Sequence, residues 1–221
     1  MKKEIVKTTD GSHTLYVPDF DETYHSKNGA FQESLHVFIQ EGLRFRSDLE
    51  ELSILEVGFG TGLNALTTLI EVESTNRKVQ YTSLEAYPLE WEVVDKLNYM
   101  DFVDVKRFAD YFKMMHTIDW EFFSAITSSF SLRKQKIKLQ EVNFEDEFDI
   151  IYFDAFAPNV QPDLWTEEIF ASMYNALKLN GVLVTYCAKG IVKRVIKSVG
   201  FNLQSIPGPP GKREMSRAVK E

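Results

Sequence analysis

The fold of this chain is decided by one stretch, Ile54-Leu55-Glu56-Val57-Gly58-Phe59-Gly60-Thr61-Gly62-Leu63-Asn64. Its first residues form a short apolar run, which predicts a buried strand. Gly58, Gly60 and Gly62 follow, and because they lack a Cβ the backbone can turn sharply and approach a ligand closely. A helix is expected to continue to about Ile70, with its free N–H groups facing whatever lies over the turn. The stretch therefore predicts a strand, a ligand-binding turn and a helix.

The spacing of these glycines is G-x-G-x-G, which differs from the G-x-G-x-x-G of dinucleotide-binding folds. Glu56 lies two residues before the first glycine, where its carboxylate would repel a pyrophosphate but could hold a cation or a hydroxyl. The pattern resembles motif I of the S-adenosylmethionine-dependent methyltransferases, whose cofactor carries a sulfonium and an amino-acid tail and no phosphate. A glycine turn that only packs the strand on the helix is the alternative.

The length of 221 residues suits one sizeable domain, or one domain with a small appendage. No stretch is apolar for long enough to span a membrane, and the N-terminus lacks the apolar run of a signal peptide. Cys187 is the only cysteine, which excludes an intramolecular disulfide and fits a cytoplasmic location. Four scattered histidines without cysteine partners argue against a structural metal site, and no metal is expected.

The formal net charge of −8 is unfavourable for a nucleic-acid-binding protein, but the charge is unevenly distributed. From Cys187 to the end of the chain there are eight Lys or Arg and two acids, so this end carries +6 and the remainder −14. A basic end on an acidic body can place an anionic substrate at one face. A solvated basic helix and tail would explain the charge equally well.

Predicted strands and helices alternate along the chain. A hairpin is predicted at 4–17, around a turn at Asp10-Gly11, and a helix at 30–45. After the first strand, further strands are predicted at 78–84, 137–142, 148–154, 181–187, 201–203 and 215–219. Helices are predicted after Pro88, within the aromatic-rich segment 101–135, at 165–179 with Asn180-Gly181 as its stop, and at 191–199.

This alternation predicts an α/β fold with a mostly parallel sheet that is covered on both faces. Seven strands are expected, with the last one antiparallel at the edge. Residues 1–48 are interpreted as an N-terminal hairpin and helix that form a lid extension, and residues 49–221 as a Rossmann-like domain.

Four acids fall near the ends of four predicted strands: Glu56, Glu85, Glu141 and Asp154. Ligands bind beyond the carboxyl ends of the strands in such sheets, so these side chains are expected to converge on one site. Glu85 is in the position from which an acid accepts hydrogen bonds from ribose hydroxyls, although a solvated carboxylate is the alternative. Asp154 is expected to orient a substrate or take part in catalysis, or else only to support the turn that follows it.

Across almost the whole chain the sequence resembles the tRNA 5-(aminomethyl)-2-thiouridylate methyltransferase family. That family is also the N-terminal half of a bifunctional 5-methylaminomethyl-2-thiouridine biosynthesis enzyme. The matching segments are 24–26 with Gly29 and Glu33, then 56–64, 85–89, 154–158, 162–165 and 211–215. The chain ends where the bifunctional enzyme continues into a flavin-dependent oxidase domain, so the resemblance is to a stand-alone methyltransferase. The family's usual Gly-Asp after the third strand is Gln140-Glu141 here.

The resemblance implies a class I methyltransferase fold with S-adenosylmethionine over the glycine turn. The acceptor would be the primary amine of 5-aminomethyl-2-thiouridine at the tRNA wobble position, and a separate FAD-dependent oxidase would supply that amine. The residues implied in cofactor binding are Tyr24, Ser26, Gly29, Glu33, Glu56, Gly58, Gly60, Thr61, Gly62, Asn64, Glu85, Glu141 and Asp154.

Individual roles follow from the same resemblance. Ser26, Gly29 and Glu33 would form a lid segment, Glu56 would help fix the amino-acid end of the cofactor, Glu85 would hold the ribose, and Glu141 would meet the adenine amine. Asp154 is the candidate catalytic residue, because it could hydrogen-bond the acceptor amine and take its proton.

Two groups of residues are candidates for RNA contacts. Phe156 and Trp165 could stack on an extruded base, or could serve only in packing. Candidate phosphate contacts are Lys189, Lys193, Arg194, Lys212 and Arg213. Three other functions stay open from the residues alone: methylation of a small-molecule amine or carboxylate, an aminopropyltransferase-like reaction, and a non-catalytic RNA- or protein-binding module.

Overall fold

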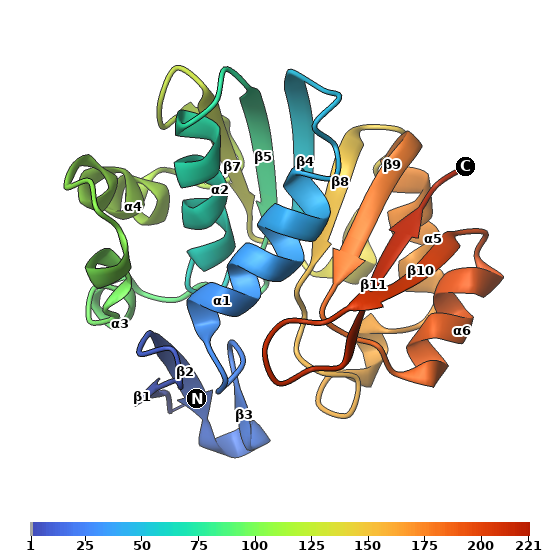
Figure 1. Cartoon of the computed structure of the whole chain (residues 1–221), viewed down its shortest axis with the longest axis horizontal. Helices are drawn as coiled ribbons and strands as arrows, with labels where there is room; N and C mark the ends of the chain where they lie inside the picture. Colours follow the sequence, from blue (N-terminus) through green and yellow to red (C-terminus); the bar gives the residue numbers. More distant parts are fainter. Residues whose placement is uncertain (1) are drawn as a thin grey trace.

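The computed structural model describes residues 2–221, and its centre is an eight-stranded sheet (Figure 1). The sheet has the order β10-β11-β9-β8-β4-β5-β7-β6. Its parallel strands are β4 (Glu51–Val57), β5 (Lys78–Leu84), β7 (Phe130–Gln135), β8 (Phe148–Phe153) and β9 (Leu177–Thr185). Its antiparallel pairs join β10 (Asn202–Pro207) to β11 (Glu214–Val219), β11 to β9, and β6 (Ser124–Ala125) to β7. The predicted Rossmann-like α/β fold with a mostly parallel sheet is confirmed.

The two edges of the sheet differ from the prediction in detail. The last strand, β11, is antiparallel as expected, but it lies between β9 and β10 and not at the edge. The reason is that β10 and β11 form a hairpin whose first strand takes the outer position. At the opposite edge the two-residue strand β6 adds an eighth strand to the seven that were predicted.

The third parallel strand lies earlier in the chain than predicted. It is β7, inside the aromatic-rich segment that was expected to be helical, whereas residues 137–142 contain only the short 3-10 helix η4 (Leu139–Glu141). Both segments alternate in polarity, but only β7 pairs with β5, from Val79 opposite Phe130 to Leu84 opposite Gln135. The helical part of the segment is η3 (Tyr99–Phe102) and α4 (Arg107–Thr117).

Helices cover both faces of the sheet, and each face has its own apolar core. Alternation along the strands directs Ile54 and Tyr152 to one core and Leu55 and Phe153 to the other. The first core is covered by α1 (Ala30–Ser34), which runs on into the π-helix η2 (Leu35–Leu43), by α2 (Leu63–Glu73), and by α3 (Trp91–Val94) and α4. The second core is covered by α5 (Glu167–Ala176) and α6 (Gly190–Ser198).

The helix that contains η2 comes very close to the sheet at Gly42. A Cβ atom there would lie 3.1 Å from the ring of Tyr152 and 3.1 Å from the side chain of Val184. The predicted helix at 30–45 is therefore present, but it is a layer of the main core, in which Phe38 and Leu43 are buried. The division of the chain at residue 48 stays a prediction.

The helix predicted at 165–179 is shorter in the structure. Thr166 caps α5 by accepting a hydrogen bond from the backbone N–H of Ile169, and the helix ends at Ala176. β9 begins at the next residue, and Asn180, with φ at +62°, lies within β9 where a helix stop was expected. The pairing of β9 with β8 shifts its register in the same region.

The N-terminal hairpin is present as predicted, from β1 (Glu4–Lys7) and β2 (His13–Val17). A third short strand, β3 (Glu22–Thr23), pairs with β2, and the two are joined by η1 (Pro18–Phe20). The remaining short helix is η5 (Pro162–Leu164). Within residues 2–221, no helix has the length and apolarity that crossing a membrane requires, and no group of three or more His, Cys, Asp or Glu side chains could hold a metal ion.

Candidate active site

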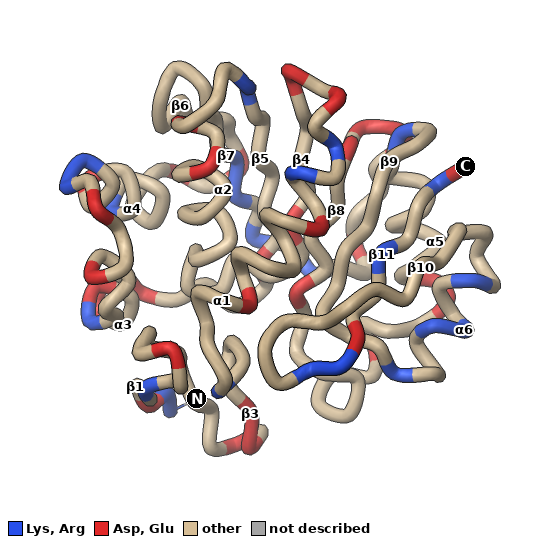
Figure 2. Tube along the Cα trace, in the orientation of Figure 1, with Lys and Arg blue, Asp and Glu red and all other residues tan. Residues whose placement is uncertain are grey.

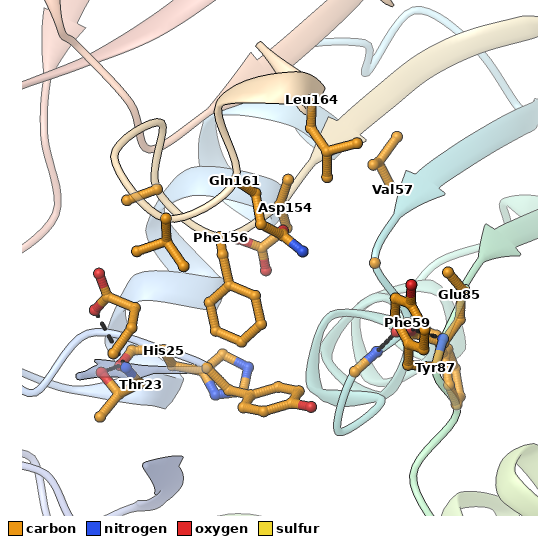
Figure 3. Close-up of a pocket in the computed structure, with 18 of the residues that line it drawn as sticks. Thr23, His25, Val57, Phe59, Glu85, Tyr87, Asp154, Phe156, Gln161 and Leu164 are labelled. Carbon is orange, nitrogen blue, oxygen red and sulfur yellow. Dashed lines mark hydrogen bonds between the residues drawn. The ribbon is translucent and has the colours of Figure 1, made fainter. Parts of the chain in front are cut away.

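The candidate site lies at the carboxyl ends of β4 and β8, the neighbouring strands between which the order of the sheet changes direction. From β4 the chain adds β5 and β7 on one side, and then returns to add β8 and β9 on the other. Such a reversal opens a crevice for a ligand. Gly58 follows β4 and Asp154 follows β8, and the backbone N–H of Asp154 donates to the carbonyl of Val57 at 3.2 Å. A cavity of about 1080 Å³ opens over these two strand ends (Figure 3).

Many of the predicted site residues line this cavity. On the side of the glycine turn lie Glu85 and Tyr87, and Asp154 and Phe156 lie across from them (Figure 3). The predicted residues that line the cavity are Tyr24, Ser26, Glu33, Gly58, Gly60, Thr61, Asn64, Glu85, Asp154, Phe156 and Lys212. The predicted residues that do not line it are Gly29, Glu56, Gly62, Glu141, Trp165, Lys189, Lys193, Arg194 and Arg213.

The glycine turn has the left-handed backbone that its sequence predicts. Gly58, Gly60 and Gly62 have φ values of +92°, +49° and +74°. A Cβ atom on Gly62 would lie 2.7 Å from Nε2 of His116, whose side chain is placed behind the turn and 3.2 Å from the carbonyl oxygen of Thr61. Gly62 is thus packed against His116, whereas Gly58 and Gly60 line the cavity.

Glu85 is held against the glycine turn by two backbone N–H groups. Oε2 accepts from the N–H of Gly60 at 3.0 Å, and Oε1 accepts from the N–H of Tyr87 at 2.8 Å. Each carboxylate oxygen can accept a second hydrogen bond. The side chain can therefore receive two hydroxyl groups from a ligand without leaving the turn.

Asp154 is tied to α2 by Asn64, whose Nδ2 donates to Oδ2 of Asp154 at 2.8 Å. The pKa of this carboxyl is raised to about 7, mainly because burial disfavours the charged form and then because of the negative charge of Glu33. The hydrogen bond from Asn64 and the positive charge of Lys212 act in the opposite direction. Near neutral pH the group can therefore both accept and release a proton.

Glu56 is in a different place from the one predicted. It shares a face of β4 with Ile54, lies opposite Tyr152 and Ser83 in the sheet, and is fully buried. Its Oε2 accepts a hydrogen bond from the hydroxyl of Ser83 at 2.6 Å, and burial raises its pKa to about 8. Strand alternation directs this carboxyl into the core, and Glu56 does not line the cavity. A direct contact with the amino-acid end of a cofactor would require that it did.

Two more predicted residues have positions that differ from those expected. Glu141 is exposed at the end of η4, and Leu139 and Gln140 line the cavity beside it, because the third strand ends at Gln135. Trp165 is only 5% exposed, donates its indole N–H to the carbonyl of Phe156 at 2.9 Å, and belongs to the second core. Packing is therefore the role that the geometry gives to Trp165.

Some basic side chains of the C-terminal end form ion pairs within the protein and are not free to bind an anionic substrate. Figure 2 shows Lys and Arg along α6 and in the loop between β10 and β11. Lys193 pairs with Glu214 at 2.6 Å, and Lys212 pairs with Glu33 at 2.6 Å. Exposed members of the predicted phosphate-contact set are Lys189, Arg194 and Arg213.

His25 and Tyr186 are cavity residues with polar side chains to which the sequence gave no role. His25 is buried against the turn, with its Nε2 3.5 Å from the hydroxyl of Thr61. Tyr186 follows β9 and donates its hydroxyl to the carbonyl of Ala155 at 2.9 Å. The position of Tyr186 at a strand end next to Asp154 was the available signal, but it depends on knowing that β9 neighbours β8.

A family model described as "S-adenosyl-L-methionine-dependent methyltransferase" matches residues 105–221. The chain belongs to this family. With that assignment the fold is that of an S-adenosylmethionine-dependent methyltransferase, and S-adenosylmethionine is its cofactor.

Similar proteins extend the comparison over nearly the whole chain. The tRNA 5-methylaminomethyl-2-thiouridine biosynthesis bifunctional protein MnmC of Cupriavidus metallidurans is 28% identical over 232 residues, which are 97% of this chain and 33% of that protein. MnmC of Leptospira interrogans is 30% identical over 207 residues, 89% of this chain and 32% of that protein. This methyltransferase thus spans about a third of the length of the curated relatives it matches.

Solved structures agree with the fold. The crystal structure of MNMC2 from Aquifex aeolicus superposes with a TM-score of 0.78 at 26% identity, covering 98% of this chain and 70% of that one. Spermidine synthase from Thermotoga maritima gives a TM-score of 0.51 at 17% identity, covering all of this chain and 72% of the other. At that identity the second likeness concerns the fold alone.

The cavity has the chemistry that this cofactor needs. S-adenosylmethionine carries an ammonium and a sulfonium and no phosphate, and the cavity presents the carboxylates of Glu33, Glu85 and Asp154. The glycine turn adds backbone at Gly58 and Gly60, where a Cβ atom would lie 3.1 Å from the carbonyl oxygen of Asp154 and 3.2 Å from the ring of Tyr24. A cation with hydroxyl groups fits this set of acceptors, whereas a pyrophosphate would be repelled by it.

Proposed function

We propose that this methyltransferase transfers a methyl group to the primary amine of 5-aminomethyl-2-thiouridine at the wobble position of tRNA, giving 5-methylaminomethyl-2-thiouridine. The observation that carries the proposal is the similarity of nearly the whole chain to proteins named for 5-methylaminomethyl-2-thiouridine biosynthesis, MnmC. The likeness to MNMC2 from Aquifex aeolicus supports it. A separate FAD-dependent oxidase that supplies the amine, and a cytoplasmic location beside the tRNA pool, belong to the same proposal.

Binding of the cofactor is assigned to the residues around the glycine turn. Glu85 would receive the ribose hydroxyls, since its two oxygens are already fixed by the N–H groups of Gly60 and Tyr87. Gly58 and Gly60 would let the cofactor lie directly on the backbone. The adenine end of the cofactor is assigned to Leu139 and Gln140 in place of Glu141, because these two residues line the cavity and Glu141 does not.

The acceptor amine needs only to be neutral and correctly positioned in order to react. S-adenosylmethionine supplies an electrophilic methyl group on a sulfonium, and a neutral primary amine is a competent nucleophile for it. Holding the amine in line with the methyl group is therefore the main contribution of the site. The role of Asp154 is to accept a hydrogen bond from the amine and then its proton, for which a pKa of about 7 is well matched to neutral pH.

The aromatic side chains that line the cavity are proposed to contact the uridine base. The ring of Phe156 makes edge contacts with Tyr24, at 5.1 Å between centroids, and with Phe20, at 6.0 Å. Recognition of an unpaired loop base favours such aromatic faces. Phosphate contacts are assigned to the exposed side chains of Lys189, Arg194 and Arg213, with Lys193 held by Glu214.

The test is transfer of a labelled methyl group from S-adenosylmethionine to tRNA bearing 5-aminomethyl-2-thiouridine, with Asp154→Ala as the inactive variant. The same tRNA without the aminomethyl group is the matched substrate control. Label in the modified tRNA alone would support the proposal. Label in free alkylamines, with none in either tRNA, would replace the tRNA with a small-molecule acceptor.

A further inference from the structure

We propose that Lys212 is a positioning residue for methyl transfer, which sets the charge around Asp154 and keeps the acceptor amine neutral, and that it does not bind tRNA phosphate. The inference rests on the proposed function above. It replaces the role in phosphate binding that the basic C-terminal end had indicated for this lysine.

The loop that carries Lys212 is pressed against the N-terminal part of the chain. The loop joins β10 to β11, and a Cβ atom on Gly211 would collide with the side-chain amide of Asn28. At the start of the loop, Nε2 of His36 lies 2.9 Å from the carbonyl oxygen of Pro207. These contacts hold the loop over the same end of the cavity at which α1 begins.

Within this arrangement the Lys212 ammonium points into the site. Its Nζ lies 2.6 Å from Oε1 of Glu33 and 3.9 Å from the centroid of the Tyr186 ring. The Glu33 side chain is only 8% exposed, and its other oxygen accepts a hydrogen bond from the N–H of Ser26 at 2.8 Å. If Lys212 turned outward to a phosphate, it would leave this buried carboxylate without its counter-charge, which is costly.

The charged groups around Asp154 come from several elements. Glu33 on α1 is negative and Lys212 on the β10–β11 loop is positive, whereas Glu56 on β4 keeps its proton near neutral pH because burial raises its pKa to about 8. Tyr186, after β9, is neutral, because burial raises its pKa well above the usual value. Lys212 therefore opposes the negative charge of Glu33, which would otherwise favour a proton on Asp154.

The charges around Asp154 also affect whether the acceptor amine is protonated, and only the neutral amine can react. A protonated amine has no lone pair for the methyl group, and a site with only carboxylates would stabilise that protonated form. A fixed cation nearby disfavours a second positive charge and so lowers the pKa of the amine. The same cation favours the ionised form of Asp154, which can accept the proton that the nitrogen loses when the new N–C bond forms and the C–S bond breaks.

The first experiment follows methyl transfer against pH in wild type, Lys212→Met and Lys212→Arg. Loss of the charge should lower kcat about 10-fold at pH 7 and move the acidic limb of the pH profile up by about one pH unit, with KM for tRNA unchanged or lower. The Lys212→Arg variant should restore the position of the limb. Lys197→Met removes the same charge from an exposed site on α6 and should leave the profile unchanged.

A second measurement tests the inference without using tRNA. Titration of ¹³C-labelled aspartate carboxyls by NMR, with Asp154 assigned from the Asp154→Asn spectrum, should give a higher midpoint for Asp154 in Lys212→Met. Glu33→Gln should move that midpoint down. If Lys212→Met does not fold, Lys212→Gln removes the same charge and should raise the midpoint in the same way.

The outcomes separate the two proposals. If wild type labels no tRNA at any pH, the proposed function fails, whereas the titration still decides the role of Lys212. A raised KM in Lys212→Met with an unmoved pH profile and an unmoved Asp154 midpoint would overturn the inference and return Lys212 to phosphate binding. Identical midpoints in Lys212→Met, Glu33→Gln and wild type would overturn it as well.

Discussion

Asn64 links the first turn of α2 to the end of β8 by donating its Nδ2–H to Oδ2 of Asp154 at 2.8 Å. The side-chain oxygen Oδ1 of Asn64 accepts a hydrogen bond from the hydroxyl of Ser34 at 2.8 Å, so the orientation of the side-chain amide is fixed by α1. Three elements thus hold one carboxylate at the point where the sheet reverses direction. The link explains why Asn64, a residue inside a helix and only 3% exposed, has a polar side chain.

Replacement of this carboxylate by an amide is the first prediction. Asp154→Asn keeps the shape and an oxygen that can accept from Asn64, but an amide cannot take a proton. We expect kcat for methyl transfer to fall about 10²- to 10⁴-fold, with the affinity for S-adenosylmethionine within a few-fold of wild type. Single-turnover transfer and calorimetric cofactor binding measure the two quantities. An Asp154→Asn enzyme with nearly full kcat would show that Asp154 only orients the turn.

The second prediction concerns the carboxylate on the opposite wall. Glu85→Ala removes the acceptor that holds the N–H groups of Gly60 and Tyr87 and, as proposed, the ribose hydroxyls. Hydrogen bonds to a charged group contribute about 1.5–3 kcal/mol, so the Kd for S-adenosylmethionine should rise about 10- to 100-fold. Glu92 is an exposed acid on the nearby α3, and Glu92→Ala is the matched control. This variant should bind S-adenosylmethionine with the wild-type Kd. Equal cofactor affinity in both variants would exclude Glu85 from the binding site.

The part of the site that lies around the first strand was predictable because its signals are local. An apolar run, three glycines and the apolar helix that follows are read directly from consecutive residues. The third strand was missed because residues 130–135 and 137–142 both alternate, and only pairing with β5 distinguishes them. The partner of Lys212 was missed for a similar reason, since Glu33 is 179 residues away and charge counting does not detect ion pairs.

Glu56 shows where a local signal misleads. Its place two residues before Gly58 is typical of a ligand contact, but alternation along β4 puts it on the face of Ile54. Whether that face meets a cavity or the core depends on how α1, η2 and α2 pack, which the sequence does not reveal. Burial of Glu56 below the turn is therefore a property of the assembled fold.

Backbone strain gives a third prediction, at Gly62. Alanine there would adopt φ near +74° and place its Cβ 2.7 Å from Nε2 of His116. We expect the free energy of unfolding to fall by about 1–3 kcal/mol. Gly190→Ala is the matched control, because its Cβ would meet only Arg194, at 3.6 Å, and at such a helical site alanine stabilises by about 0.4–1 kcal/mol. Urea denaturation of both variants measures the difference, and equal stabilities would contradict the strain argument.

The last prediction uses the buried carboxyl of Glu56, whose pKa is raised from 4.5 to about 8, chiefly by burial. Between these two values the folded protein keeps a proton that the unfolded chain has released, so the stability of the folded state falls as pH rises through this window. In Glu56→Gln the side chain is neutral at every pH and this loss is absent. Relative to wild type, the free energy of unfolding of the variant should therefore increase between pH 5 and 8, by on the order of 1–3 kcal/mol.

The measurement is urea denaturation of both proteins at several pH values. Glu51→Gln, at an exposed position on the same strand, is the control and should follow the wild-type curve. If the curves of Glu56→Gln and wild type ran parallel from pH 5 to 8, Glu56 would be ionised in the folded protein. Its charge would then need a cation close to the glycine turn, which is the direct contact with the cofactor that the sequence had predicted.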